Sequence, residues 1–177
     1  NYISGKAVDH YHRYEEDFDK AKELGHTAHR FSIEWSRIEP EESHWNEEAL
    51  QHYRGVIQSL RAKNIEPFVT LWHWTLPLWI AKRGGILAPD FPEVFDRYTK
   101  KIVETIGPDV QFWITLNEPD VVTSHAYLKA AWPPQEKNFF SFLRANFALL
   151  KAHRKSYRTI KSIFPEAMVG IAKHQVS

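Results

Sequence analysis

The chain has 177 residues, of which 43% are hydrophobic and 25% charged, as expected for a soluble globular protein with one core. Its formal net charge of +1 gives no electrostatic reason to expect a nucleic-acid or anionic-membrane partner. The absence of cysteine excludes disulfides, thiolate metal ligands and cysteine nucleophiles, and it favours a reducing compartment. We therefore expect a cytoplasmic location.

The ends of the sequence and its most apolar stretch lead to two further expectations. The chain begins at Asn1 and its single methionine is Met168, so we expect that residue 1 is not a translation start. The most apolar window, residues 69–81, is interrupted by His73 and Pro77 and is too short to cross a bilayer. No signal peptide is visible, and we predict no membrane partner.

Helical and strand-like patterns alternate along the chain. In chain order we predict a helix at 15–24, a strand at 27–33, a helix at 46–63, a strand at 66–72, a helix at 90–106, a strand at 111–116, a short helical segment, a break at Trp132-Pro133-Pro134, a helix at 140–163 and a strand at 168–172. Asp90 and Glu93 have the spacing of a capping box, and Gly107-Pro108 is expected to end that helix.

Each predicted helix has an apolar stripe that we expect to face the core. The stripes are Phe18, Ala21 and Leu24; Leu50, Tyr53, Ile57 and Leu60; Phe95, Tyr98, Ile102 and Ile106; and Leu143, Phe147, Leu150, Tyr157 and Ile160. Apolar strands that alternate with amphipathic helices indicate an α/β fold with a parallel sheet covered by helices. Without a linker-like segment, residues 1–177 are expected to form a single domain.

Polar and aromatic residues follow all four predicted strands, which parallel pairing would bring to one rim of the sheet. The strands end in Glu34-Trp35, Trp72-His73-Trp74, Asn117-Glu118 and Lys173-His174-Gln175. Carboxyl, amide, imidazole and indole groups together suit a sugar, whose hydroxyls take polar contacts and whose C–H face packs on an aromatic ring. The alternative is that these residues are helix caps and tryptophans at the edge of the core.

Four segments in order resemble landmarks of glycoside hydrolase family 1, which comprises retaining β-glucosidases, β-galactosidases and related β-glycosidases. They are Asp9-His10-Tyr11-His12-Arg13-Tyr14, Arg30-Phe31-Ser32-Ile33-Glu34-Trp35-Ser36-Arg37-Ile38, His73-Trp74-Thr75-Leu76-Pro77 and Thr115-Leu116-Asn117-Glu118-Pro119. The resemblance covers nearly the whole chain. It implies a β-linked sugar substrate and no cofactor or metal.

The resemblance also implies roles for five residues. Glu118 matches the general acid/base, which protonates the leaving glycosidic oxygen and then activates water. Asn117 matches the ligand of the sugar 2-hydroxyl. His73 matches a ligand of the glycone, the sugar whose glycosidic bond is cleaved, and Trp74 matches a residue in the wall of the same subsite. Arg30 matches the arginine that pairs with the nucleophile and keeps it ionised.

Plainer interpretations remain open for several residues. Arg30 could equally be a structural ion-pair partner, and Trp35 is expected to pack in the core. The spacings of His10 with His12 and of His26 with His29 are loosely metal-like, but a zinc site would need more convergent ligands.

The departures from the family pattern concern the rest of the site. The chain has neither the family's N-terminal strand with a glycone-binding glutamine nor the Thr/Ser-Glu-Asn-Gly run that carries the nucleophile. Gly84-Gly85-Ile86 replaces the usual Gly-Gly-Trp. A full barrel takes about 250 residues, so the resemblance implies a partial (β/α)8 TIM barrel, a half-barrel equivalent to strands two to five.

A half-barrel has two open strand edges, so we expect association with a complementary barrel fragment or as a homo-oligomer, unless the interior has been repacked. Two hypotheses remain for its function: the acid/base part of a retaining β-glycosidase, or a non-catalytic sugar-binding or scaffold fragment. A third is an inverting hydrolase that uses Glu34 as second carboxyl. The sequence leaves the sugar and the aglycone open.

Overall fold

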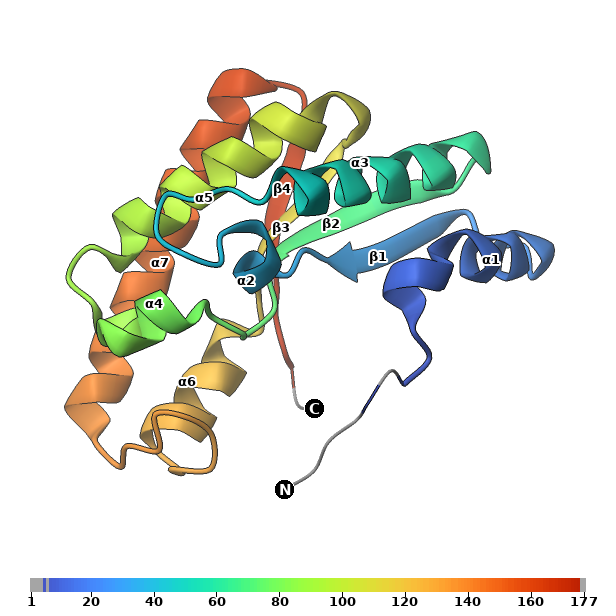
Figure 1. The fold of residues 1–177 in the computed structure, drawn as a ribbon. Coiled ribbons are helices and arrows are strands. Elements are labelled where there is room, and N and C mark those ends of the chain that lie inside the picture. The colour runs from blue at the N-terminus through green and yellow to red at the C-terminus, as the bar shows by residue number, and fades with distance from the viewer. Residues whose placement is uncertain (1–4, 6, 176–177) are drawn as a thin grey trace.

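The computed structural model describes residue 5 and residues 7–175, and its central feature is a four-stranded parallel sheet (Figure 1). The strands are β1 (Ala28–Ser32), β2 (Glu66–Trp72), β3 (Phe112–Asn117) and β4 (Met168–Ala172), and they lie side by side in chain order. The predicted α/β fold, with about four parallel strands, is confirmed. The bounds of β2 and β4 agree with the prediction, whereas β1 is shorter and β3 is displaced by one residue.

Helices cover one face of this sheet, and no helix of the described residues covers the other, which we call the open face (Figure 1). They are α1 (His10–Glu23), α2 (Trp35–Ile38), α3 (Glu47–Ala62), α4 (Leu78–Lys82), α5 (Phe91–Ile106), α6 (Pro119–Tyr127) and α7 (Phe139–Ile163), with 3₁₀ turns η1 (Gly85–Leu87) and η2 (Gly107–Asp109). The short helices α2 and α4 were not predicted. Because α2, α4 and α6 follow the C-terminal ends of the first three strands, they shape the rim of the sheet. No helix in the described part of the chain has the length and apolarity to cross a membrane.

Helix ends follow local rules in one case and tertiary contacts in another. The side chain of Asn46 accepts a hydrogen bond from the backbone N–H of Ala49 at 3.1 Å, and this caps α3. The capping box predicted at Asp90 is wrong, because its side chain makes no cap bond and instead forms an ion pair with Arg83. The ion pair with the Arg83 guanidinium therefore takes the place of the predicted hydrogen bond from Asp90 to the start of α5.

The core lies between the covered face of the sheet and the helices. Val69, Leu71 and Trp113 are fully buried there. The predicted stripes of α3 and α5 are confirmed as buried: Leu50, Tyr53, Ile57, Leu60, Phe95, Tyr98, Ile102 and Ile106. In the first helix Phe18 and Ala21 are buried, but Leu24 is 77% exposed because α1 ends before it.

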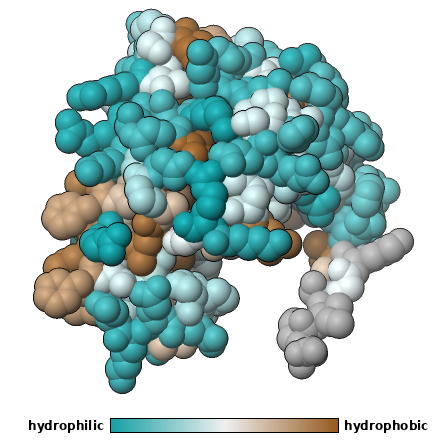
Figure 2. All heavy atoms as spheres, turned by 60° about the vertical axis from the view of Figure 1, so that its left-hand side comes forward, coloured by the Kyte–Doolittle hydropathy of each residue, from teal (hydrophilic) through white to brown (hydrophobic). Residues whose placement is uncertain are grey.

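The predicted inward face of α7 is mostly wrong. Its buried residues are mainly small: Ser141, Ala145, Leu149, Ala152, Ser156 and Ile160. Small side chains let α7 lie close to α5, where the hydroxyls of Thr99 and Ser156 are 2.9 Å apart. The larger residues Leu143, Phe147, Leu150 and Tyr157 are consequently exposed. Figure 2, in which the side that carries α7 comes forward, shows apolar side chains at the surface.

The open face of the sheet keeps apolar side chains uncovered. Arg30, Phe68 and Phe112 are register partners, so their side chains share this face. The rings of Phe68 and Phe112 stack at 4.2 Å and remain partly exposed. A hollow of about 500 Å³ lies against β3, β4 and the C-terminal part of α7, and Met168 in its wall is 58% exposed.

Candidate active site

Three predicted site residues meet at the C-terminal rim of the sheet. The amide oxygen of Asn117, in β3, accepts a hydrogen bond from Nη2 of Arg30, in β1. The amide nitrogen of Asn117 lies 3.1 Å from Nε2 of His73, which directly follows β2. Asn117 is 3% exposed, so the contacts of both neighbours fix its orientation. The structure thus brings Arg30, His73 and Asn117 together as one network.

The network also determines the protonation of His73. Because an amide nitrogen only donates, Nε2 of His73 accepts, and the ring is neutral with its proton on Nδ1. Burial lowers the pKa of His73, and the charge of Arg30 lowers it further against a smaller opposing effect of Glu118. Within the described residues the Nδ1 proton of His73 meets no acceptor, so it and the second amide proton of Asn117 give the rim two hydrogen-bond donors.

Trp74 lies beside the network, where its ring contacts that of His73. Its indole N–H donates to the backbone carbonyl of Asn117 at 2.9 Å, and its backbone has a φ of 81°, which is costly for a bulky residue. Its ring lies 4.8 Å from that of Trp132, which in turn stacks on His125 at 4.4 Å. From the sequence, Trp132 is expected only as part of a chain break, since no local signal ties it to Trp74.

Glu118 follows the network at the junction of β3 and α6. Its backbone N–H donates to the carbonyl of Ala172 at 2.7 Å, and its φ of 44° lies in the left-handed region. The side chain is partly buried and does not cap α6, which begins at Pro119. Backbone strain of this kind often occurs at functional sites. The tight junction leaves the carboxyl available for a ligand rather than for the helix.

Arg30 forms no ion pair among the described residues, which disfavours the interpretation that it is a structural ion-pair partner. Besides Asn117, its partner is the hydroxyl of Thr70, to which Nε donates at 3.0 Å. Thr70 is fully buried, so it fixes the guanidinium from below. Sequence reasoning missed Thr70, because a threonine within an apolar strand gives no signal of such a contact. The arginine therefore brings to the rim a positive charge that forms no ion pair within the described residues.

Glu34 and Trp35 have structural contacts. The carboxyl of Glu34 accepts hydrogen bonds from the Ser36 hydroxyl at 2.6 Å and from the Thr75 hydroxyl at 2.7 Å, so both of its oxygens are engaged. It also caps α2. Trp35 is 1% exposed, and its predicted packing role is confirmed. These contacts favour a capping role for Glu34 over a second catalytic carboxyl.

The remaining titratable groups that the sequence singled out lie apart from the network. His10 pairs with Asp17 at 2.6 Å and His12 with Asp9 at 2.7 Å, both in the N-terminal part of the chain. Within residues 7–175 the structure contains no group of three or more side chains that could hold a metal ion. Beyond β4, residues 173–175 end the described chain, and all three are exposed.

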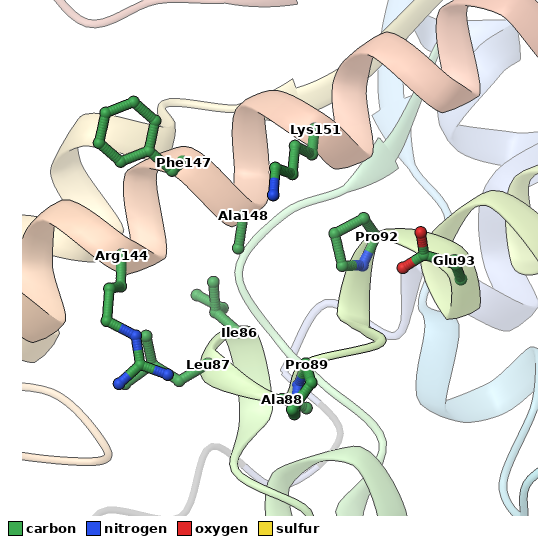
Figure 3. Close-up of a pocket in the computed structure, with 10 residues that line it drawn as sticks. All are labelled: Ile86, Leu87, Ala88, Pro89, Pro92, Glu93, Arg144, Phe147, Ala148 and Lys151. Atoms are coloured by element: carbon green, nitrogen blue, oxygen red, sulfur yellow. The ribbon is translucent and has the colours of Figure 1, made fainter.

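A separate surface pocket lies between η1, the start of α5 and α7 (Figure 3). Its volume is about 280 Å³, and its walls include Ile86, Pro92 and Phe147, with Arg144 and Lys151 at the side of α7. None of the five predicted site residues lines it. The candidate active site is therefore an open rim and not this pocket.

Comparison with known proteins agrees with this geometry. A model of glycosyl hydrolase family 1 matches residues 1–177. The 1,4-beta-D-glucan glucohydrolase of Thermotoga neapolitana is 37% identical over 93% of this chain and 39% of that protein. Beta-glucosidase A of Thermotoga maritima is 36% identical over 93% of this chain and 37% of that protein.

A solved structure of a family 1 β-glucosidase from Thermotoga maritima superposes with a TM-score of 0.91 at 35% identity. It covers 94% of this chain, whereas this chain covers 38% of it. The chain thus spans about two fifths of the length of these relatives. Since the family model matches every residue from 1 to 177, the chain belongs to glycosyl hydrolase family 1.

Proposed function

We propose that this chain supplies the acid/base half of a retaining β-glycosidase site that hydrolyses terminal β-linked sugars, with β-glucosides as the first substrate to test. One observation carries the proposal: Asn117 is held between Arg30 and His73, and the strained residue Glu118 follows it directly. The names of the relatives, β-glucosidase and glucan glucohydrolase, support the choice of sugar. Residues 1–177 act in this proposal as one part of a barrel domain.

The proposed roles follow from the contacts. Glu118 protonates the glycosidic oxygen as the bond breaks and later takes a proton from the attacking water. The free amide proton of Asn117 and the Nδ1 proton of His73 bind glycone hydroxyls, and Trp74 packs against the sugar ring. We propose that Arg30, which has no carboxylate partner among the described residues, pairs with the nucleophile. The two oxygens of Glu34 are already engaged, so we propose that the nucleophile lies outside this chain.

We also propose that a complementary barrel segment binds the free edge of β4 and the exposed side of α7. Phe140 and Phe147 are 75% and 63% exposed, and Met168 lies on the edge strand. The indole N–H of Trp113, which lines the hollow along β4, is buried without an acceptor among the described residues. A segment that adds a strand to β4 would cover these apolar groups and remove the open edge. A homo-oligomer that uses the same surface is the alternative.

The decisive experiment compares aryl β-glucosides with good and poor leaving groups. The unsubstituted chain is assayed alone and together with the C-terminal remainder of a family 1 relative. We expect turnover in the second case, and we expect Glu118→Gln to reduce it by roughly 10²–10⁴-fold for the poor leaving group. The reduction is expected to be smaller for the good leaving group, which needs less protonation. Asp120→Asn is the matched control, since Asp120 is an exposed carboxyl just beyond the same strand.

The outcomes separate the hypotheses. Turnover that Glu118→Gln leaves unchanged would exclude Glu118 as the acid/base. Sugar binding without turnover in either mixture would favour the non-catalytic fragment. Light scattering of the chain alone and with the added remainder distinguishes a homo-oligomer from a complemented barrel.

A further inference from the structure

Strand β3 contains one more residue than β4 just before the candidate site. Ile114 is paired with Gly170 and Asn117 with Ala172, so β3 advances three residues while β4 advances two. An extra residue on one strand is a β-bulge, which disturbs the alternation of side chains between the two faces of a sheet. The face on which Asn117 emerges therefore depends on this bulge.

Contacts on the two faces show that the bulge has reversed the alternation. Asn117 and Thr115 are two residues apart, so in a regular strand they would point to the same face. Thr115 lies on the covered face, where its hydroxyl is 2.8 Å from Nδ1 of His153 in α7. Asn117 instead contacts Arg30, whose side chain lies on the open face. The bulge has turned Asn117 away from the helices and toward the candidate site.

A short chain of hydrogen bonds holds the bulge from the covered side. The hydroxyl of the fully buried Thr115 donates to the carbonyl of Gly170 at 3.2 Å, at the position where the pairing becomes irregular. A hydroxyl has one proton, so in the contact with His153 the imidazole must donate from Nδ1. Burial lowers the pKa of His153, which favours the neutral ring. The contact with Thr115 then selects the tautomer with its proton on Nδ1.

We propose that Thr115 and His153 are positioning residues: their hydrogen bonds fix the bulge in β3, and the bulge aims Asn117 and Glu118 at the ligand. Neither residue reaches the open face, so both act through the backbone of β3. That Asn117 and Glu118 face a ligand rests on the proposed function. The dependence of the bulge on Thr115 and His153 does not rest on it. In a regular β3, Asn117 would point at α7 and lose Arg30 and His73.

The test uses the side-chain amide of Asn117 as a reporter in NMR spectra of the ¹⁵N-labelled chain. We expect its two proton resonances to be separated in the unsubstituted chain and to lose that separation in Thr115→Val and His153→Leu. His153→Asn keeps an N–H donor near the position of Nδ1, so it is expected to retain the resonances of the unsubstituted chain. Thr99→Val is the matched control, because Thr99 is a buried threonine whose hydroxyl also contacts α7, through Ser156 at 2.9 Å.

The outcomes that overturn the proposal are separate from those of the glycosidase assay. If the Asn117 resonances stay unchanged in Thr115→Val and His153→Leu while Tm falls as in Thr99→Val, the contact is merely structural. Should those variants fail to fold, long-range ¹H–¹⁵N spectra of the unsubstituted chain decide, since a His153 proton on Nε2 alone would exclude the hydrogen-bond chain. If Thr115→Val and His153→Leu lose the separation of the Asn117 resonances but the complemented unsubstituted chain has no glycosidase activity, the proposed function is refuted and the positioning role stands.

Discussion

The two faces of the sheet are made by the same four strands but carry different kinds of residue. The covered face has Val69, Leu71 and Trp113, all fully buried against the helices. The open face has Arg30 and the partly exposed pair Phe68 and Phe112. Strand alternation thus divides each segment between a side that stabilises the fold and a side that carries the candidate chemistry.

This difference means that stability and function should respond to different substitutions in neighbouring residues. The bulge in β3 is the exception, because there a residue of the covered face, Thr115, controls the direction of a residue of the open face, Asn117. A family motif read from the sequence contains both residues, but it does not show that they point to opposite faces.

The largest contrast is expected between two adjacent residues of β3. Trp113→Ala removes a side chain that is 1% exposed, and we expect it to lower the free energy of unfolding by about 3–5 kcal/mol. Phe112→Ala removes mainly the stacking on Phe68, and we expect a loss of about 1 kcal/mol. Urea unfolding followed by circular dichroism measures both. Equal losses would show that the open face is as tightly packed as the covered one.

Two glycines give a smaller contrast of the same kind. A Cβ at Gly107, after α5, would lie 2.2 Å from Cε2 of Phe164, so Gly107→Ala is expected to cost about 1–3 kcal/mol by displacing that ring. A Cβ at Gly170, in the edge strand β4, would meet nothing within 4 Å. Gly170→Ala is therefore expected to change stability by less than about 1 kcal/mol. Thermal unfolding of the two variants checks the difference, and a large cost at Gly170 would contradict an open edge.

The sequence predicted most of the fold because the strands and the stripes of α3 and α5 follow simple periodic patterns. It failed for α7, where large apolar residues such as Phe147 and Leu150 compete with a stripe of small residues such as Ala145 and Ala152. Hydrophobicity favours the first set, but close approach to α5 selects the second. Periodicity alone cannot distinguish a face that packs within this chain from a face that remains available to a partner.

The sequence predicted the candidate site through the family motif, and it missed the residues that support the site. Arg30, His73 and Asn117 were named and do meet, while the proposed roles await the assays above. Thr70 and His153 were not named and Trp132 was named only in a chain break, because their contacts join residues far apart in the chain. Such long-range geometry has no local signature in the sequence.

The smallest expected effect is a dependence of stability on pH, which comes mainly from the covered side. Burial is the largest cause that lowers the pKa of His29, His52, His73 and His153 below the usual 6.5.

The unfolded chain therefore binds more protons than the folded chain below about pH 6.5. The contribution of these histidines to the free energy of unfolding is fully present above that pH, and it is lost as the pH falls through their pKa values in the folded state. Burial raises the pKa of Glu39, which gives an opposite slope at lower pH, so variants must be compared with the unsubstituted chain. We expect the urea midpoint to fall between pH 7.5 and 5.5, and to fall less in His29→Asn. His73 serves as the comparison from the open face, and if His73→Asn alone removed the dependence, the covered histidines would not be its source.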